Sequence, residues 1–383
     1  MINVSKLYCG LSGESDHLRY SANNSFGPVI VYNCTARCNL NCVHCYSLSG
    51  PTAAADELTT AQAKKLLTDI AEANCPVVLF SGGEPLMRED LLELLAEAKK
   101  LALRTVISTN GTLIDLAAAQ KLAAVGVSYV GVSIDGKERF HDAFRRTEGS
   151  FKAAINGMKN CNKVSVKTGL RFTITKANCG QIPAVFDIAA AAGVRRICFY
   201  HLIRSGRAET LDGHAPSIEQ TREVVDTIVE KTVDFAAMGL VDEVLTVDNH
   251  ADGPYLLIKM KRENKPRYHE ARQLLLANGG NKIGERIACV GWGGEVYPDQ
   301  FWRNYSLGNV RGRTFRQIWE NTGDLVLSKL RNKEEHRAPK CRLCNWFDLC
   351  KGNYRFLGAD SGERNWLNEP ACYLMDEELA IRA

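Results

Sequence analysis

The feature that most limits the folds open to this chain is the alternation of short apolar runs with amphipathic stretches between residues 28 and 200. The apolar runs are nearly continuous, which is typical of strands buried on both faces of a parallel sheet. Between them, apolar residues recur at i, i+3 and i+4, as from Ala63 to Ala71, where Thr59 or Thr60 could cap the helix. We therefore expect covering helices and six strands, at residues 28–32, 77–80, 105–108, 129–134, 170–174 and 196–200.

Six βα units are too few for a closed eight-stranded barrel, so the pattern predicts an α/β fold with a partial (β/α)6 barrel. In such folds the chemistry lies at the C-terminal ends of the strands. Beyond about residue 240 the alternation stops and Gly, Trp, Tyr and Cys become more frequent, which indicates a second, smaller module. The expected organisation is an N-terminal extension (1–27), the barrel (28–216), a connecting helical segment (217–285) and a cysteine-bearing module (286–383).

Fourteen cysteines are the second unusual feature of the sequence. The N-terminus has no apolar signal segment and no apolar run is long enough to cross a bilayer, so we expect a cytoplasmic protein without a membrane partner. A reducing cytosol favours metal ligation over disulfides for clustered cysteines. A net charge of +4 is too small to indicate a nucleic-acid partner. Most isolated cysteines are expected to be small buried hydrophobic residues.

Three cysteines, Cys38, Cys42 and Cys45, lie in one loop directly after the first predicted strand. Thiolates are the usual ligands of iron–sulfur clusters, and a complete site uses four of them. Three cysteines at these spacings can hold one cubane cluster and leave one iron without a protein ligand, as a catalytic metal site requires. The alternative is a structural zinc site completed by His44 or Cys34.

The spacing of this loop resembles that of the radical S-adenosylmethionine (SAM) superfamily, with His44 in the position usually held by an aromatic residue. Further motifs that resemble those of the family follow the next three predicted strands. Any one of them alone is more often a turn than a site, but together they indicate the family. These motifs are SGGEP (81–85), STNG (108–111), SIDG (133–136) and HDAFR (141–145).

The resemblance implies a role for each motif. The Gly-Gly-Glu segment would hold the SAM amino group, the next two motifs would contact its ribose and carboxylate, and Arg145 would pair with that carboxylate. The implied mechanism is electron transfer from a reduced cluster to SAM and hydrogen abstraction by a 5′-deoxyadenosyl radical, without catalytic side chains beyond the cluster and SAM. The cofactor-binding residues implied in this way are Gly82, Gly83, Glu84, Ser108, Asn110, Ser133, Asp135 and Arg145.

A second group of cysteines lies near the C-terminus, at Cys341, Cys344, Cys350 and Cys372. Four thiolates complete a cluster with no open iron, which is typical of an electron-transfer or structural site, and zinc is the alternative. The spacing resembles the SPASM and twitch modules of radical SAM enzymes. A full SPASM module holds two auxiliary clusters, but Tyr354 stands where a further cysteine would be, so we expect one. The implied cofactors are therefore two [4Fe–4S] clusters and SAM. Cys289 aligns with the first cysteine of the missing cluster and could be a vestige, a free thiol or an alternative ligand.

Short stretches at both ends of the chain resemble the tetrapyrrole-modifying group of this family. Residues 1–10 are similar to the opening of 12,18-didecarboxysiroheme deacetylases, and residues 294–302 and 370–374 look like the wider haem-biosynthesis group. The resemblance implies an iron-tetrapyrrole substrate, removal of its acetate side chains to give iron-coproporphyrin III, and a low-potential electron donor such as ferredoxin or flavodoxin. The alternatives are side-chain removal in haem d1 biosynthesis (the NirJ type), iron-coproporphyrin decarboxylation, a peptide-modifying maturase and a non-catalytic tetrapyrrole carrier.

A basic stretch between the two modules could hold the carboxylates of such a substrate, with His269 approaching its iron. The alternative is a solvated helix face, which is the more common arrangement of such charges. The cations are Lys259, Lys261, Arg262, Lys265, Arg267 and Arg272.

Overall fold

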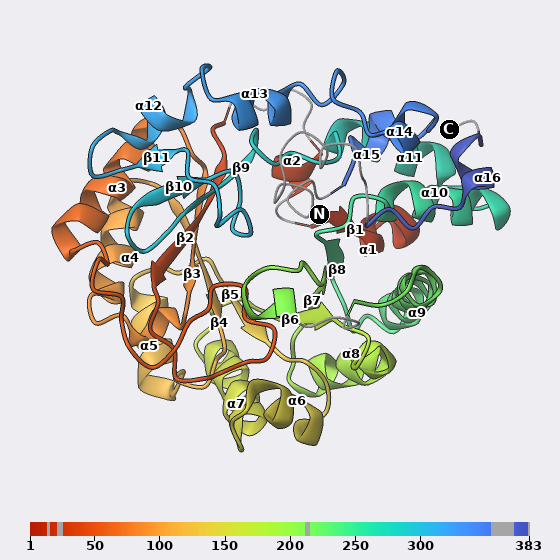
Figure 1. Ribbon diagram of the computed structural model, residues 1–383. Coiled ribbons are helices and arrows are strands. Elements are labelled where there is room, and N and C mark those ends of the chain that lie inside the picture. Colours follow the sequence, from red (N-terminus) through yellow and green to blue (C-terminus); the bar gives the residue numbers. More distant parts are fainter. Residues whose placement is uncertain (14–15, 21–25, 211–214, 354–370, 382–383) are drawn as a thin grey trace.

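One curved sheet of eleven strands runs through the molecule (Figure 1). The computed structural model describes residues 1–13, 16–20, 26–210, 215–353 and 371–381. The strand order is β1-β8-β7-β6-β5-β4-β3-β2-β9-β10-β11. The strands are β1 (Ile2–Asn3), β2 (Val29–Thr35), β3 (Val77–Gly82), β4 (Arg104–Thr109), β5 (Tyr129–Ser133), β6 (Thr168–Ile174), β7 (Arg196–His201), β8 (Glu243–Val247), β9 (Ile287–Val290), β10 (Glu295–Tyr297) and β11 (Gly308–Asn309).

The central strands β2 to β8 pair in parallel, each with the next along the chain. Helices follow the strands and cover the outer side of the curve, as Figure 1 shows from α3 on the left to α9 on the right. The covering helices are α3 (Thr60–Glu72), α4 (Leu91–Lys100), α5 (Leu116–Ala124), α6 (Glu138–Arg145), α7 (Ser150–Lys163), α8 (Ile182–Ala191) and α9 (Ile218–Ala237), with 3-10 turns η1 (Pro85–Met87), η2 (Cys179–Gln181) and η3 (Gly206–Thr210).

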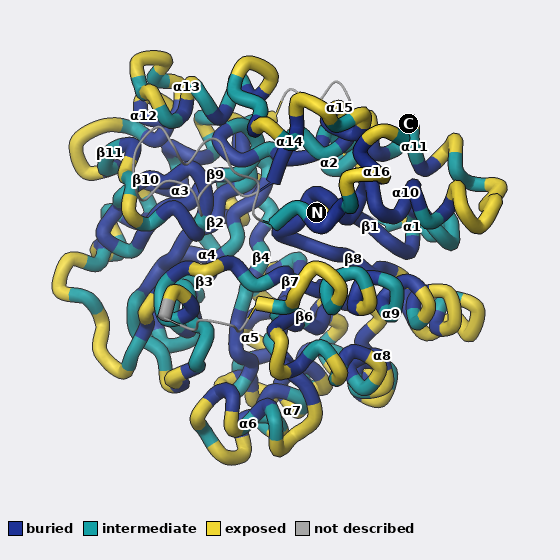
Figure 2. The backbone as a smooth tube through the Cα atoms, turned by 45° about the vertical axis from the view of Figure 1, so that its right-hand side comes forward, coloured by how far each residue is buried: buried dark blue, intermediate teal, exposed yellow. Residues whose placement is uncertain are grey.

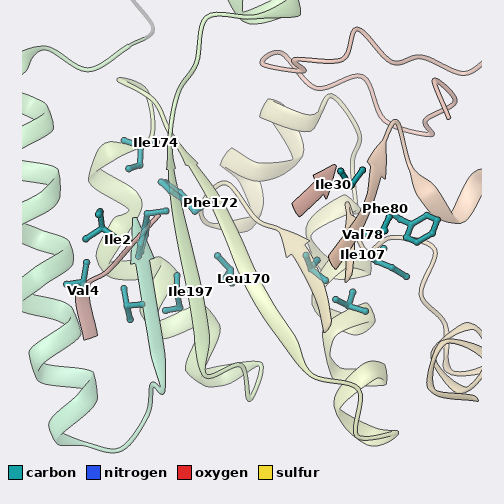
Figure 3. Close-up of a cluster of buried hydrophobic side chains, with 14 of the residues drawn as sticks. Ile2, Val4, Ile30, Val78, Phe80, Ile107, Leu170, Phe172, Ile174 and Ile197 are labelled. Carbon is teal, nitrogen blue, oxygen red and sulfur yellow. The ribbon is translucent and has the colours of Figure 1, made fainter. Parts of the chain in front are cut away.

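The main core lies between the sheet and these helices (Figure 3). Alternate strand residues such as Ile30, Phe80 and Phe172 point into it and are fully buried. Burial of one such side chain contributes about 1.5–3 kcal/mol. Helix α3 turns its Leu66 and Ile70 face to this core and begins at a capping box on Thr59, as predicted. In Figure 2 the sheet and the inner helix turns are buried, whereas the outer helix turns and loops are exposed.

All six predicted strands are present, as β2 to β7. The prediction that the alternation stops near residue 240 was wrong, because β8 continues the parallel sheet and α10 (Asp252–Arg262) follows it. Strand β8 begins with the charged Glu243 and has only two consecutive apolar residues, Val244 and Leu245. A run this short is hard to distinguish from a loop by periodicity.

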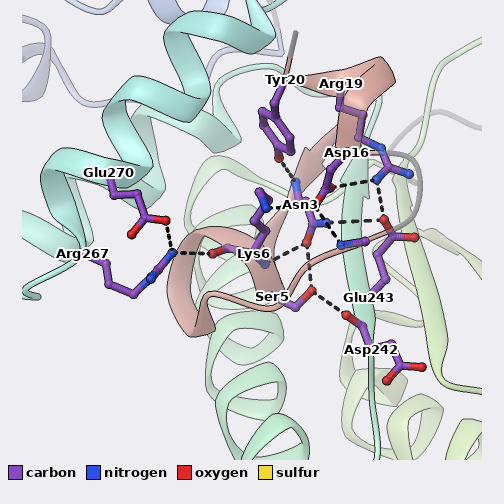
Figure 4. A network of polar contacts seen from close by, with 11 residues as sticks. Asn3, Ser5, Lys6, Asp16, Arg19, Tyr20, Asp242, Glu243, Arg267 and Glu270 are labelled. Atoms are coloured by element: carbon purple, nitrogen blue, oxygen red, sulfur yellow. Dashed lines mark hydrogen bonds and ion pairs between the residues drawn. The ribbon is translucent and has the colours of Figure 1, made fainter.

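The first residues of the chain belong to the sheet edge. Strand β1 pairs antiparallel with β8, and α1 (Val4–Cys9) begins directly after it. The Asn3 side chain caps α1 by accepting from the Lys6 backbone N–H at 2.9 Å, and it donates to the buried Glu243 at 3.4 Å (Figure 4). Glu243 also pairs with Arg19 of α2 (Asp16–Arg19) and with Arg196 at 2.9 Å. This carboxylate therefore ties the N-terminus to β7 and β8.

The C-terminal segment extends the opposite side of the sheet. Strand β9 pairs in parallel with β2, and β10 and β11 add antiparallel strands beyond it. The predicted boundaries at residues 27, 216 and 285 fall between elements, while the sheet itself continues across the modules. None of the helices in the described part of the chain has the length and apolar character needed to span a membrane. The remaining helices are α11 (Tyr268–Asn278), α12 (Phe315–Trp319), α13 (Leu325–Arg331), α14 (Pro339–Arg342), α15 (Phe347–Cys350) and α16 (Asp376–Leu379).

Candidate active site

A cavity of about 160 Å³ opens at the C-terminal ends of the parallel strands, where the fold class predicts chemistry. Its wall contains all three cysteines of the loop, Cys38, Cys42 and Cys45. Six of the eight residues expected to bind SAM share that wall, while Glu84 and Asp135 lie behind it. The six are Gly82, Gly83, Ser108, Asn110, Ser133 and Arg145.

Each sulfur of the cysteine loop has a polar neighbour. The Leu40 backbone N–H donates to Cys38 Sγ at 3.4 Å, and Arg145 donates to Cys42 Sγ at 3.4 Å. Ser47 Oγ lies 3.3 Å from Cys45 Sγ. Hydrogen-bond donors around sulfur stabilise the thiolate form that ligates metal. The three sulfurs are thus placed as a ligand set that shares one cavity.

This donor set fits an iron–sulfur cluster better than the zinc alternative. Cys34 lies in the core on the helix side of the sheet, and His44 stacks on Phe144 with ring centroids 4.6 Å apart. In the described ranges no three His, Cys, Asp or Glu side chains converge to hold a single ion. Burial raises the pKa of Cys38 to about 12 and that of Cys42 above its ordinary value, so binding of a metal centre would release protons here.

Gly82 and Gly83 are needed for a close approach between two backbone segments. The N–H groups of Gly83 and Glu84 donate to the carbonyls of Thr35 and Arg37, at 2.7 and 2.8 Å, at the start of the cysteine loop. A Cβ on Gly83 would lie 2.1 Å from the Arg37 carbonyl oxygen, and Gly82 has a φ of 120°. Both positions therefore require glycine. The glycines bring the end of β3 against the cysteine loop as well as lining the cavity.

Glu84 holds the neighbouring loop rather than facing the cavity. Its fully buried carboxylate accepts from Thr109 Oγ1 at 2.7 Å, the Asn110 N–H at 2.8 Å and the Leu86 N–H at 3.2 Å. Burial raises the pKa of Glu84, and these three donors oppose that shift. Asn110, which does line the cavity, is thereby fixed in position. Glu84 is therefore a positioning residue for Asn110 in this structure.

Asp135 likewise supports a residue of the cavity wall. Its buried carboxylate lies 2.5 Å from Arg145 Nε, so the guanidinium of Arg145 bridges Asp135 and the Cys42 sulfur. Burial would raise the pKa of Asp135, but the charge of Arg145 outweighs it and holds the pKa below its ordinary value. Arg145 is thus fixed beside the cysteine loop, with its charge already compensated.

A second and larger cavity, of about 550 Å³, adjoins the first. Four residues line both cavities, which are therefore neighbours; they are His201, Leu202, Ile203 and Asp248. On its far side the second cavity is lined by Cys372 and Tyr373. Cys372 also lines a small pocket that holds the C-terminal group of cysteines. The three spaces therefore lie in sequence from the cysteine loop to the auxiliary cysteines.

The structure brings all four predicted auxiliary ligands to that small pocket: Cys341, Cys344, Cys350 and Cys372. Phe347, Leu374 and Leu379 are among the other residues that line it. Burial raises the pKa of Cys350, and the three neighbouring thiols raise it further. Four thiols that line one apolar pocket fit a four-thiolate cluster, which is larger than a single ion.

Two other predicted features lie elsewhere. Cys289 is buried in β9, where its sulfur accepts from Asn33 Nδ2 at 3.6 Å, and burial raises its pKa to about 12. Such a thiol is unreactive. Tyr354, the residue that replaces a cysteine, lies outside the described residues.

The basic stretch of residues 259–272 lies on α10 and α11, away from the segments that line the two cavities. Most of its cations pair with acids, which supports the surface interpretation. These pairs are Lys259 with Asp226 and Glu263, Arg262 with Glu378, Lys265 with Glu263, and Arg267 with Glu270.

Sequence reasoning missed two cavity residues, Arg171 and His201. Arg171 stands inside the apolar run of a predicted strand, where a charge is unusual. His201 follows directly after another predicted strand, at the end where active sites form. Both signals were present in the sequence, but each is weak without the packing around it.

The chain is similar to known families and to proteins of known activity. Two family models match the chain: the radical SAM superfamily over residues 32–178, and an iron–sulfur cluster-binding domain, SPASM, over residues 282–345. The chain is 46% identical to the Fe-coproporphyrin III synthase of Methanosarcina barkeri, over 99% of both chains. It is 36% identical to the pre-heme d1 synthase of Dinoroseobacter shibae, over 92% of this chain and 87% of that one.

Among solved structures, SuiB of Streptococcus suis bound to the precursor peptide SuiA aligns with a TM-score of 0.73 at 16% identity, over 91% of this chain and 76% of that one. Native anSMEcpe with bound AdoMet aligns with a TM-score of 0.69 at 18% identity, over 92% and 95%. Identities this low concern the fold alone. The two structural alignments confirm the predicted partial-barrel fold, and the match to the SPASM family model confirms the C-terminal iron–sulfur module.

The Glu84 network predicts the effect of replacing its carboxylate. In Glu84→Gln, an amide N–H₂ would face the Asn110 N–H, so Asn110 should shift on the cavity wall. The hydrogen bond that is lost joins Glu84 to Asn110, so its energy sets only the upper limit of the effect on SAM, a roughly ten- to hundredfold loss of affinity. Equilibrium SAM binding to the reconstituted enzyme would measure this, with iron content unchanged. Glu89→Gln, an exposed change in the same segment, is the matched control. Wild-type SAM affinity in Glu84→Gln would contradict the assignment.

Proposed function

Since the chain belongs to the radical SAM superfamily, within its SPASM-bearing group of haem-biosynthesis enzymes, we propose that it removes acetate side chains from 12,18-didecarboxysiroheme to give iron-coproporphyrin III. The first domain binds a [4Fe–4S] cluster and SAM, and the SPASM domain adds iron–sulfur binding. The chemistry that the cluster and SAM supply together is hydrogen-atom abstraction by a 5′-deoxyadenosyl radical. The relative at 46% identity, which matches over full length, is named for this product.

The observation that carries the proposal is the position of the larger cavity. It lies between the cavity of the cysteine loop and Cys372 of the auxiliary group, and it shares four lining residues with the first cavity. A substrate there would reach the SAM cavity with one edge, while Tyr373 and Ile203 exclude water from its faces. A flat molecule with an apolar face and polar rim suits a cavity whose lining mixes such residues with Arg204 and Asn249.

His201 is the residue that we propose as the axial ligand of the substrate iron. Among the described histidines, His201 alone lines both cavities. Its Nε2 lies 3.0 Å from Asp252 Oδ2, and Tyr373 donates to the other Asp252 oxygen at 2.6 Å. Metal-binding histidines commonly bond a carboxylate through one ring nitrogen and the metal through the other. No hydrogen bond to Nδ1 of His201 occurs within the described part of the chain, which leaves this nitrogen available to iron.

The test of the activity is anaerobic incubation of the reconstituted enzyme with didecarboxysiroheme, SAM and a low-potential reductant. Mass analysis should show iron-coproporphyrin III and 5′-deoxyadenosine. The triple variant in which Ala replaces Cys38, Cys42 and Cys45 should form neither, because it lacks the ligands of the catalytic cluster, yet it should retain the auxiliary iron. Unchanged didecarboxysiroheme beside rapid SAM cleavage in the wild type would exclude this reaction. Ferredoxin and flavodoxin, compared as reductants, would then identify the donor class.

For the auxiliary group, Cys350→Ala should still cleave SAM but lose substrate turnover, and it should melt at a lower temperature. The reason is that one of four ligands is lost from the pocket that Cys372 shares with the larger cavity. Iron and sulfide analysis with electron paramagnetic resonance should show two clusters in the wild type and one in the variant. Cys179→Ala, at an isolated and partly exposed cysteine, is the control and should match the wild type. Zinc in the auxiliary site would contradict this assignment.

For His201, the informative variant is His201→Gln, because the glutamine amide can still donate to Asp252 while the ring nitrogen is lost. We expect a shifted visible absorption spectrum and at least tenfold weaker binding of iron-coproporphyrin III, with partial recovery on addition of imidazole. Metal-free coproporphyrin III is the matched control ligand, and its affinity should not change. Equal losses for both porphyrins would show that His201 shapes the cavity without binding iron.

A further inference from the structure

Arg171 occupies an unusual place in the interior of the barrel. It lies on β6 and lines the cavity of the cysteine loop. Its stem crosses β5 at Gly131, where a Cβ would lie 2.7 Å from Arg171 Cδ. Its guanidinium lies 4.5 Å from the centroid of the Tyr200 ring. A stacked guanidinium keeps its in-plane N–H groups free for a further partner.

Arg171 has no carboxylate partner among the described residues. In the described ranges of the chain, it makes no hydrogen bond or ion pair with protein. The groups that influence its pKa besides burial are Tyr200, Cys198, Tyr129 and Tyr46, all of which are neutral at pH 7. Two other arginines of the barrel are each compensated by a carboxylate, Arg145 by Asp135 and Arg196 by Glu243.

Arg171 is partly buried and faces the cavity. A cation in such a partly enclosed space without a counter-charge favours the binding of an anion beside it. The guanidinium fork matches the geometry of a carboxylate. We propose that Arg171 is the carboxylate-binding residue of the central cavity. Two molecules bring a carboxylate there: SAM, through its methionine portion, and the tetrapyrrole, through the acetate to be removed. The second source rests on the proposed function.

The test uses Arg171→Gln in the reconstituted enzyme, with Arg316→Gln, at an exposed arginine of α12, as the control. Because the variant removes an uncompensated charge, its melting temperature without ligands should equal or exceed that of the wild type. A residue with a purely structural role would give a lower melting temperature. Binding is then measured with two matched ligand pairs, each differing by the carboxylate in question.

The first pair is SAM and decarboxylated SAM. If Arg171 binds the SAM carboxylate, the variant should lose roughly ten- to a hundredfold in affinity for SAM and nothing for the decarboxylated analogue. The second pair is didecarboxysiroheme and iron-coproporphyrin III, which lacks the acetates. If Arg171 binds the acetate, only the former should bind more weakly to the variant.

The proposal would be overturned if Arg171→Gln bound SAM and didecarboxysiroheme with wild-type affinity. It would also be overturned if the melting temperature fell and both ligands of each pair lost affinity equally. Failure of the proposed function gives a different result. In that case the wild type itself does not bind didecarboxysiroheme, and the SAM pair alone decides the role of Arg171.

Discussion

The arrangement of the whole molecule depends on β2, which pairs in parallel with β3 on one side and β9 on the other. The cysteine loop begins where β2 ends, and the glycines at the end of β3 hold its first residues by backbone hydrogen bonds. Strand β9 introduces the C-terminal segment that carries the auxiliary cysteines. Parallel strands end at a common edge, so this double pairing sets the catalytic and the auxiliary ligands at fixed positions relative to each other. The larger cavity is the space left between them.

Several buried charges of the molecule are compensated by an opposite charge. Asp135 neutralises Arg145 beside the Cys42 sulfur, and Glu243 binds Arg196 below the barrel. The C-terminus follows the same rule, since the buried Glu378 accepts from Arg222 of α9 at 2.8 Å with both oxygens. Burial would raise the pKa of Glu378, but Arg222 outweighs it and lowers the pKa to about 2. Arg171, in contrast, faces the cavity of the cysteine loop and has no carboxylate partner among the described residues.

Much of the fold and of the site could be predicted from the sequence because the signals are local. Apolar periodicity marked β2 to β7, and cysteine spacing marked both ligand groups, all seven members of which line the expected cavities. Gly82 and Gly83 of the motif after β3 line the cavity. The direction of the Glu84 carboxylate could not be predicted, because it depends on donors from Thr109 and Asn110 at the end of the next strand. Strand β8 was missed because it is stabilised by pairing with β7 and β1, which its own short apolar run does not indicate.

By itself the sequence determined the class of fold and the two cysteine groups, since these depend on local periodicity and on the spacing of cysteines. The tertiary structure alone decided which side chains share a cavity. It brought Tyr373 and Asp252 to His201, set Cys372 at the border between the larger cavity and the auxiliary pocket, and left Arg171 facing the cavity of the cysteine loop without an acid among the described residues. The physical reason is that these contacts join segments far apart in sequence, and their geometry follows from strand order and side-chain packing, which spacing and periodicity do not encode.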